Sequence, residues 1–320
     1  MSAAPVWKRA GPAWLAAVLL LGVLAPILAP RPPDLQEDVA GARFLPPLSR
    51  AHLLVLQDGR PIVVTSLHAG SGGWEFVRAG ESGQVAADRL SRAPEPRFYP
   101  LGTDSLGRDL LARLLFGLRH SVLIAALSVV LALALGVMVG AAAGLLGSRW
   151  DALLMAGVDA LRSIPRLLLY LLCATLFPPS SLLMVIVLGA TTWTGLARIV
   201  RAEMLALRGS DLAAAARAAG ARPLRTVLRH LLPQMAPLLA VNGALRFADT
   251  LLLESALSLL GLGAPAPAIS LGSIMASGRE ALSDAWWIVA WPGLLISSLL
   301  LSVRSTATLL FRVSDPPSIA

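Results

Sequence analysis

The chain has 320 residues, of which 56% are hydrophobic and only 14% are charged, and its mean hydropathy is +0.71. This composition excludes an ordinary soluble domain and indicates a protein that crosses a lipid bilayer several times. The net charge of +8 does not indicate a nucleic-acid partner, because the basic residues are spread among apolar segments rather than gathered on one aqueous face.

The first predicted element is an apolar helix within residues 1–30. Its apolar run, Ala13–Ala29, follows Lys8 and Arg9, a pattern that signal peptides and membrane anchors share. We expect an anchor, because further spans follow and no small-x-small cleavage site ends the run. Residues 1–30 are therefore predicted to hold a cytoplasmic N-terminus and the first transmembrane helix.

Residues 31–100 are polar and form the predicted extracytoplasmic segment. Within it Leu53–Leu56 and Pro61–Val64 flank an Asp58-Gly59 turn, which is the pattern of a β-hairpin. A third strand is predicted at Trp74–Val77. We therefore expect a small β-containing insert in an otherwise all-α polytopic membrane protein.

Residues 101–118 are predicted to form an interfacial elbow helix before the second span. Thr103 or Asp104 is a suitable N-cap, and Asp109 and Arg113 have the i, i+4 spacing of an ion pair on a helix. We expect capping and pairing to be the role of these charges, with recognition of a ligand as the alternative.

Residues 119–313 hold the remaining spans, each of which needs about 20 residues to cross the hydrocarbon. The run Leu167–Phe177 is too short, so we expect its helix to extend back past Pro165, with the side chains of Arg162 and Arg166 reaching the interface. Four other runs have sufficient apolar length: Ser121–Leu146, Ser181–Ala197, Leu238–Leu262 and Trp286–Val303. With the first helix, the prediction is about six spans.

Orientation is predicted from the arginines of the segment 198–233. Loops rich in Lys and Arg stay in the cytoplasm, and this segment has seven arginines against Glu203 and Asp211. The arginines are Arg198, Arg201, Arg208, Arg217, Arg222, Arg225 and Arg229. A cytoplasmic position for this segment, together with six spans, predicts that both termini are cytoplasmic.

The same segment is predicted to fold as helix, corner, helix. Gly220 is suited to end an alanine-rich helix, and Pro223 is suited to the first turn of the next one. The second helix places arginines opposite a row of apolar residues. Two interpretations follow: a loop that merely obeys the positive-inside rule, or a rigid elbow on which a partner protein docks.

This elbow resembles the coupling motif of binding-protein-dependent ABC importer permeases. That motif is Glu-Ala-Ala, three residues, Gly, and then a hydrophobic-x-Leu-Pro ending; this chain departs from it at Ala214, where the family usually has Glu, and at His230. The resemblance implies an ATPase-coupling loop that contains Asp211, Ala215, Ala216, Arg217, Gly220, Leu232 and Pro233.

Two further stretches resemble the dipeptide and oligopeptide permeases of that family, and the resemblance covers roughly residues 97–313. Tyr99–Arg113 resembles the segment before their second span and holds an elbow motif of Gly102, Thr103, Asp104, Gly107, Arg108 and Asp109. The last two spans resemble those of the second-permease subfamily, through Leu253–Gly263, Leu271–Met275, Ala285–Trp287 and Trp291–Gly293.

The resemblance implies a permease subunit that moves peptides of the dipeptide or oligopeptide class from an extracytoplasmic binding protein across the bacterial inner membrane. It implies a second homologous permease, two cytoplasmic ABC ATPases and the solute-binding protein as partners. The chain has no Gly-rich phosphate-binding loop ending in Lys-Ser or Lys-Thr. We therefore expect no cofactor in this chain, with ATP-Mg bound by the partner subunits.

The predicted fifth span contains Arg246, Asp249 and Glu254, and ionisable residues within a membrane are costly enough to mark a functional path. These three are candidates to line the translocation path. Mutual neutralisation of Arg246 and Asp249 is an equally weighted structural alternative, and so is a structural role for Glu254. An ion-coupled secondary transporter that uses the same three residues is the alternative function.

A membrane-embedded enzyme is disfavoured, and we predict no catalytic residue and no metal site. Such an enzyme needs convergent polar ligands, whereas the four histidines fall in different compartments and the single cysteine lies in an apolar run. These residues are His52, His68, His120, His230 and Cys173.

Overall fold

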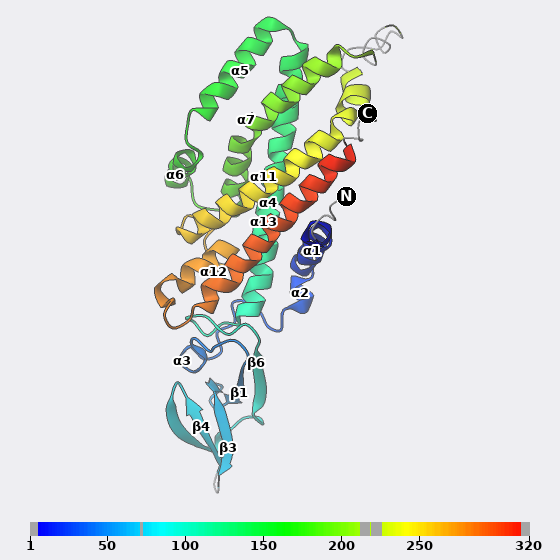
Figure 1. Ribbon diagram of the computed structural model, residues 1–320. Coiled ribbons are helices and arrows are strands. Elements are labelled where there is room, and N and C mark those ends of the chain that lie inside the picture. Colours follow the sequence, from blue (N-terminus) through cyan, green and yellow to red (C-terminus); the bar gives the residue numbers. More distant parts are fainter. Residues whose placement is uncertain (1–5, 71–72, 212–217, 219–225, 315–320) are drawn as a thin grey trace. The chain divides into compact units, whose positions relative to one another are not determined.

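The computed structural model describes residues 6–70, 73–211, 218 and 226–314 of a chain that divides into two compact units. The helical unit comprises residues 1–18, 122–254 and 298–320, and the insert unit comprises residues 19–121 and 255–297. Figure 1 labels all of the following helices except α10. They are α1 (Val6–Val23), α2 (Ala25–Leu28), α3 (Val39–Ala42), α4 (Leu110–Leu145), α5 (Ser148–Arg162), α6 (Arg166–Leu176), α7 (Ser181–Arg208), α10 (Leu232–Gln234), α11 (Ala236–Leu259), α12 (Leu271–Gly278) and α13 (Trp287–Ser314).

Within the described residues, four helices are long and apolar enough to cross a membrane: α4, α7, α11 and the part of α13 up to Phe311. They correspond to the predicted second, fourth, fifth and sixth spans. Two shorter apolar helices, Ala10–Val23 and α6, correspond to the predicted first and third spans. The all-α polytopic class is therefore confirmed.

The structure differs from the prediction at the third span, because the observed helix does not continue back through Pro165. Helix α5 ends at Arg162 and α6 begins at Arg166, with Pro165 in an extended conformation (φ −59°, ψ 126°) as the N-cap. Proline disfavours helical geometry in the residue before it and cannot donate a backbone hydrogen bond. The result is a broken helix whose second piece has only 11 residues.

Helices α4 and α7 approach closely along a row of glycines in the helical unit. A Cβ atom at Gly136 would lie 2.7 Å from Leu196 Cβ, one at Gly140 would lie 2.5 Å from the carbonyl oxygen of Ala197, and one at Gly144 would lie 2.8 Å from Met204 Cγ. Small residues at every fourth position let two membrane helices pack backbone to backbone. These glycines fix α7 against α4.

Helix α5 also packs against α7, and two ion pairs join them. Asp159 pairs with Arg198, and Asp151 binds Arg201 through both of its carboxylate oxygens. These arginines were counted in the predicted loop between spans, but α7 continues as a helix to Arg208. Part of that basic segment is therefore the end of a long helix.

The polar insert folds into two three-stranded antiparallel sheets in the order β2-β1-β6 and β3-β4-β5. The predicted hairpin is present: Leu53 faces Val63, and the turn places Gly59 at φ +83°. The predicted third strand is also present, but it pairs within the second sheet. The strands are β1 (Ser49–Val55), β2 (Pro61–Val64), β3 (Ser66–Gly70), β4 (Gly73–Arg78), β5 (Glu81–Ala86) and β6 (Glu95–Tyr99).

Asp38 ties these sheets together. Its carboxylate caps α3 through the Gly41 N–H, accepts the Val63 N–H of β2 at 2.9 Å, and binds both Nε and Nη2 of Arg78 at the end of β4 at 2.8 Å. Burial raises the pKa of Asp38, but the hydrogen bonds from Arg78, Val63 and Gly41 outweigh burial and leave the pKa below its ordinary value. The ionised carboxylate is thus a cross-link in the insert.

Candidate functional site

The charged residues of α11 have different environments in the helical unit. Arg246 lies near the middle of the helix and is half-buried, whereas Asp249 is exposed. The predicted mutual neutralisation is not seen, since no ion pair joins these two described side chains. The guanidinium instead lies against α7, where a Cβ atom at Gly195 would come within 2.6 Å of Arg246 Nη2.

Glu254, the third predicted path residue, is fully buried near the end of α11. Its charge acts on the phenol of Tyr170, which is also buried and comes from α6. A carboxylate in such a place needs polar neighbours. Glu254 therefore lies near α6, and its role in a translocation path stays a prediction.

The end of the predicted coupling loop is held in the apolar core of the helical unit. A π-helical turn covers Val227–Leu231, and its last hydrogen bond runs from the Leu232 N–H to the Val227 carbonyl. Pro233 favours this π-helical turn, because proline has no N–H to donate to the carbonyl four residues earlier. A wider turn accommodates this loss, and such turns are frequent at functional sites.

This turn presents its apolar residues to the membrane helices and its arginine to solvent. Val227 and Leu231 are buried in one cluster with α7, as is Met235 just beyond α10, and Arg229 is exposed. The expected opposition of arginine and apolar residues therefore holds for the described part of the second helix. The cluster consists of Val200, Met204, Val227, Leu231 and Met235, with Val137, Ala141, Leu145, Leu207, Leu232 and Leu239 packed against it.

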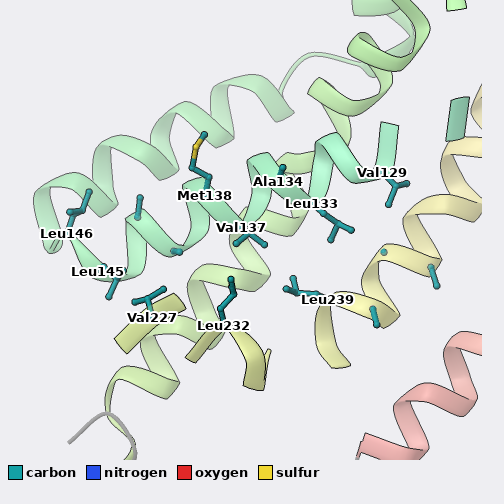
Figure 2. Close-up of a pocket in the computed structure, with 15 residues that line it drawn as sticks. Val129, Leu133, Ala134, Val137, Met138, Leu145, Leu146, Val227, Leu232 and Leu239 are labelled. Atoms are coloured by element: carbon teal, nitrogen blue, oxygen red, sulfur yellow. The ribbon is translucent and has the colours of Figure 1, made fainter. Parts of the chain in front are cut away.

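An apolar groove of about 950 Å³ lies beside this turn (Figure 2). It is lined by α4 from Val129 to its end at Leu145, by Leu146 just beyond it, by Val227 and Leu232, and by the start of α11 from Leu239 to Ala244. Figure 2 shows Val227, Leu232 and Leu239 on the side of the groove opposite α4. Leu232 of the hydrophobic-x-Leu-Pro ending is thus part of the surface that joins the loop to two long helices.

The other coupling residues are only partly covered by the structure. Asp211 is exposed directly after the end of α7. Four lie outside the described residues: Ala215, Ala216, Arg217 and Gly220. Their role in coupling stays a prediction.

The elbow motif differs from the predicted helix at 101–118. Residues up to Asp109 form turns, and α4 then runs without interruption from Leu110. Gly102 and Gly107 have φ of +84° and +71°, which excludes a regular helix there. The cap of α4 is Asp109, which accepts the N–H of Leu111 at 2.9 Å.

Asp104 is the centre of this motif and is fully buried. Its carboxylate accepts the N–H groups of Leu106 and Arg108 at 2.9 and 3.0 Å, binds the Arg108 guanidinium at 2.7 Å and pairs with Arg113 at 3.3 Å. Arg113 also reaches Asp34. The predicted partner of Arg113, Asp109, instead pairs with Arg31.

Asp109 and Thr103 join this motif to the segment that follows the first helix. Burial raises the pKa of Asp109 above its ordinary value, against the Ala112 N–H and the charge of Arg31. The Thr103 hydroxyl accepts the Leu45 N–H at 2.8 Å and donates to the Ala42 carbonyl. These contacts indicate that the motif connects the insert to the start of α4.

Sequence reasoning missed several of these partners. Arg31, Asp34 and Asp38 lie in a proline-rich segment without periodicity, so no pattern connected them to charges further along the chain. The helix-packing glycines at 136, 140 and 144 were detectable, because a spacing of four small residues is a known signal. No cluster of three potential metal-ligating side chains occurs among the described residues.

Comparison with known proteins places this geometry in a family. Residues 136–316 match the family described as the binding-protein-dependent transport system inner membrane component. A peptide transport system permease protein of Brucella suis is 42% identical over 229 residues, which cover 71% of this chain and 77% of the relative.

Two further relatives and one solved structure agree with this match. The oligopeptide transport system permease OppC of Haemophilus influenzae is 35% identical (63% of this chain, 66% of the relative), and the di/tripeptide permease DppC of Pseudomonas aeruginosa is 37% identical (68% and 72%). A chain of the inward-facing MetNI methionine ABC transporter has the same fold, with a TM-score of 0.55, 19% identity, and coverage of 65% of this chain and 98% of that one. The chain therefore belongs to the family of binding-protein-dependent inner membrane components, the permeases of ABC importers.

Proposed function

We propose that this permease imports peptides of the dipeptide or oligopeptide class, delivered by an extracytoplasmic binding protein. Relatives from three genera with 35 to 42% identity are named for peptide, oligopeptide or di/tripeptide transport. The polytopic helices supply a membrane path. ATP-Mg is bound by partner subunits in this proposal, because the chain lacks a phosphate-binding loop.

The observation that carries the coupling proposal is the packing of the turn Val227–Leu231. Its buried residues contact the cluster formed with α7, and its neighbour Leu232 lines a groove between α4 and α11. A displacement of the preceding loop also moves those helices, because close-packed cores shift as units rather than deform. ATPase closure then changes the access of the path from one side to the other.

The proposed assembly contains a second homologous permease, two cytoplasmic ABC ATPases and the solute-binding protein. The proposed orientation places both termini and the segment 198–233 in the cytoplasm, in accordance with its arginine content. The ATPases dock on the loop that contains Ala216 and Gly220, and the binding protein approaches the opposite face of the membrane.

The experiment is a co-purification from mild detergent with tagged wild type, Ala216→Trp, and Ala87→Trp as the control. Ala87 is exposed in the insert unit, so the same gain in side-chain size occurs far along the chain from the coupling loop. We expect wild type and the control to bring two ATPases and a second permease, and Ala216→Trp to lose the ATPases. Retention of the ATPases by Ala216→Trp would contradict the docking assignment.

Recovery of the wild type without ATPases, together with transport by the purified chain alone, would contradict the importer proposal itself. The ion-coupled carrier based on Arg246, Asp249 and Glu254 would then be the better explanation.

A further inference from the structure

Three arginines of the helical unit interact electrostatically near the middle of α11. The guanidinium of Arg246 lies against Gly195 of α7. Arg162 and Arg166 stand on the two sides of the break between α5 and α6, and both act electrostatically on Arg246. Both helices that flank the break pack along α7 in Figure 1.

Arg246 is half-buried and has no ion-pair partner in the described part of the chain, whereas Arg162 and Arg166 are exposed. Among the described residues, none forms an ion pair or hydrogen bond with the side chain of Arg246, Arg162 or Arg166, and the carboxylate that acts on Arg246 is the exposed Asp249. Other arginines of α7 do have partners, since Arg198 and Arg201 pair with aspartates of α5.

Helix stability does not account for the cluster either. Arg166 is the first residue of α6, where a cation opposes the helix dipole. A half-buried guanidinium in the middle of a membrane helix costs free energy, and such groups mark binding sites or paths. Gly195 provides the space for that guanidinium, because any larger residue would collide with Arg246 Nη2.

We propose that Arg246, supported by Arg162 and Arg166, is a binding site for the free C-terminal carboxylate of the cargo peptide. The planar guanidinium can donate two parallel hydrogen bonds to a carboxylate. Every linear peptide with a free terminus carries this group whatever its side chains are. The inference deepens the proposed function and rests on it, since it names the part of the peptide that the path recognises.

The test uses the assembled transporter in nanodiscs of zwitterionic lipid, without the binding protein, and a fluorescent tripeptide in free-acid and C-terminal amide forms. Anisotropy gives the affinity of each form for wild type, Arg246→Gln, Arg246→Lys and the control Arg304→Gln. Arg304 is an exposed arginine of α13 and is outside the cluster.

We expect wild type and the control to bind the free acid about tenfold more tightly than the amide, the size of one charge-assisted contact. Arg246→Gln removes this preference, and Arg246→Lys retains part of it, because a lysine keeps the charge but not the planar fork. Gly195→Ala, which displaces only the flexible end of Arg246, weakens the preference while leaving the fold intact.

Equal preference in wild type and Arg246→Gln overturns the inference, as does failure of wild type to bind the free acid. A lipid phosphate is the other source of an anion, so the measurement is repeated with anionic lipid. Abolition of the wild-type preference by anionic lipid would assign the site to a headgroup and overturn the cargo assignment.

Uptake by cells separates this inference from the proposed function. Absence of peptide uptake by the wild-type transporter contradicts the proposed function. Normal uptake together with an unchanged acid-to-amide ratio in Arg246→Gln contradicts only the carboxylate site.

Discussion

At the start of α4 the buried charges have partners, whereas the half-buried Arg246 in the middle of α11 forms no ion pair with any described residue. Asp104 receives two N–H groups and two guanidinium groups, and Asp109 pairs with Arg31. Arg246 has a glycine as its neighbour and an exposed aspartate three residues away. Both regions contain charges that are costly to remove from water, but among the described residues only the first region compensates that cost with ion pairs.

This difference separates two uses of charge. A network with satisfied partners holds segments together, and its removal affects the folded state. A buried charge without a partner destabilises the folded protein, so its presence in a membrane helix indicates that a ligand binds it. The elbow motif is therefore structural by its contacts, and the α11 cluster is the place where cargo recognition is expected.

The largest expected effect is on the satisfied network. Asp104→Asn leaves the buried Arg113 with two longer contacts, to Asp34 and to the Pro33 carbonyl, and removal of one partner of a buried pair costs about 3–5 kcal/mol. Thermal unfolding of the purified protein, followed by tryptophan fluorescence, measures the loss. The control is Asp58→Asn, which breaks an exposed pair with Arg60 and should leave the unfolding temperature unchanged. Equal losses of unfolding temperature in Asp104→Asn and Asp58→Asn would contradict the structural role of the buried network.

An intermediate effect is expected at Asp38, where it depends on pH. Asp38→Asn weakens the link to Arg78 and leaves one N–H of the Asp38 site poorly satisfied, at a cost of about 1–3 kcal/mol. The pKa of Asp38 is lowered in the folded state, so its contribution is complete above the unfolded pKa of about 3.9 and is lost as the pH falls through the lower folded value.

The measurement is the difference in unfolding temperature between wild type and Asp38→Asn from neutral pH to acid. The difference should stay constant at pH above about 5 and shrink below about 4. The raised pKa of Asp109 acts in the opposite direction, since its protonated form relieves a penalty as the pH falls, but this contribution is common to both proteins and cancels. A difference that does not change with pH would show that the Asp38 charge is not involved.

The smallest expected effect on stability is at Arg246. Arg246→Gln removes a charge that has no partner among the described residues, so unfolding should change by less than about 1 kcal/mol or become less favourable. The same unfolding assay checks this expectation beside Asp104→Asn. A loss as large as that of Asp104→Asn would show that Arg246 is a structural partner, and the two regions would then not differ in the use of charge.

The sequence by itself determined the approximate position of the four long spans and the hairpin at Asp58-Gly59, whereas the helix that was predicted to continue through Pro165 is broken there. Long apolar runs, turn residues and prolines act through local chemistry, so they are readable from neighbours in the chain. The family motifs around Gly102 and Leu232 were readable for the same reason, because they are contiguous.

Only the tertiary structure decided which charges meet. The i, i+4 rule paired Asp109 with Arg113, but Asp109 lies outside the helix as its cap, so Arg113 reaches Asp104 and Asp34 instead. Likewise the contact between Gly195 and Arg246 joins residues on different helices. Ion pairing depends on distance in space, and the glycine row that brings α4 against α7 fixes distances that no local pattern contains.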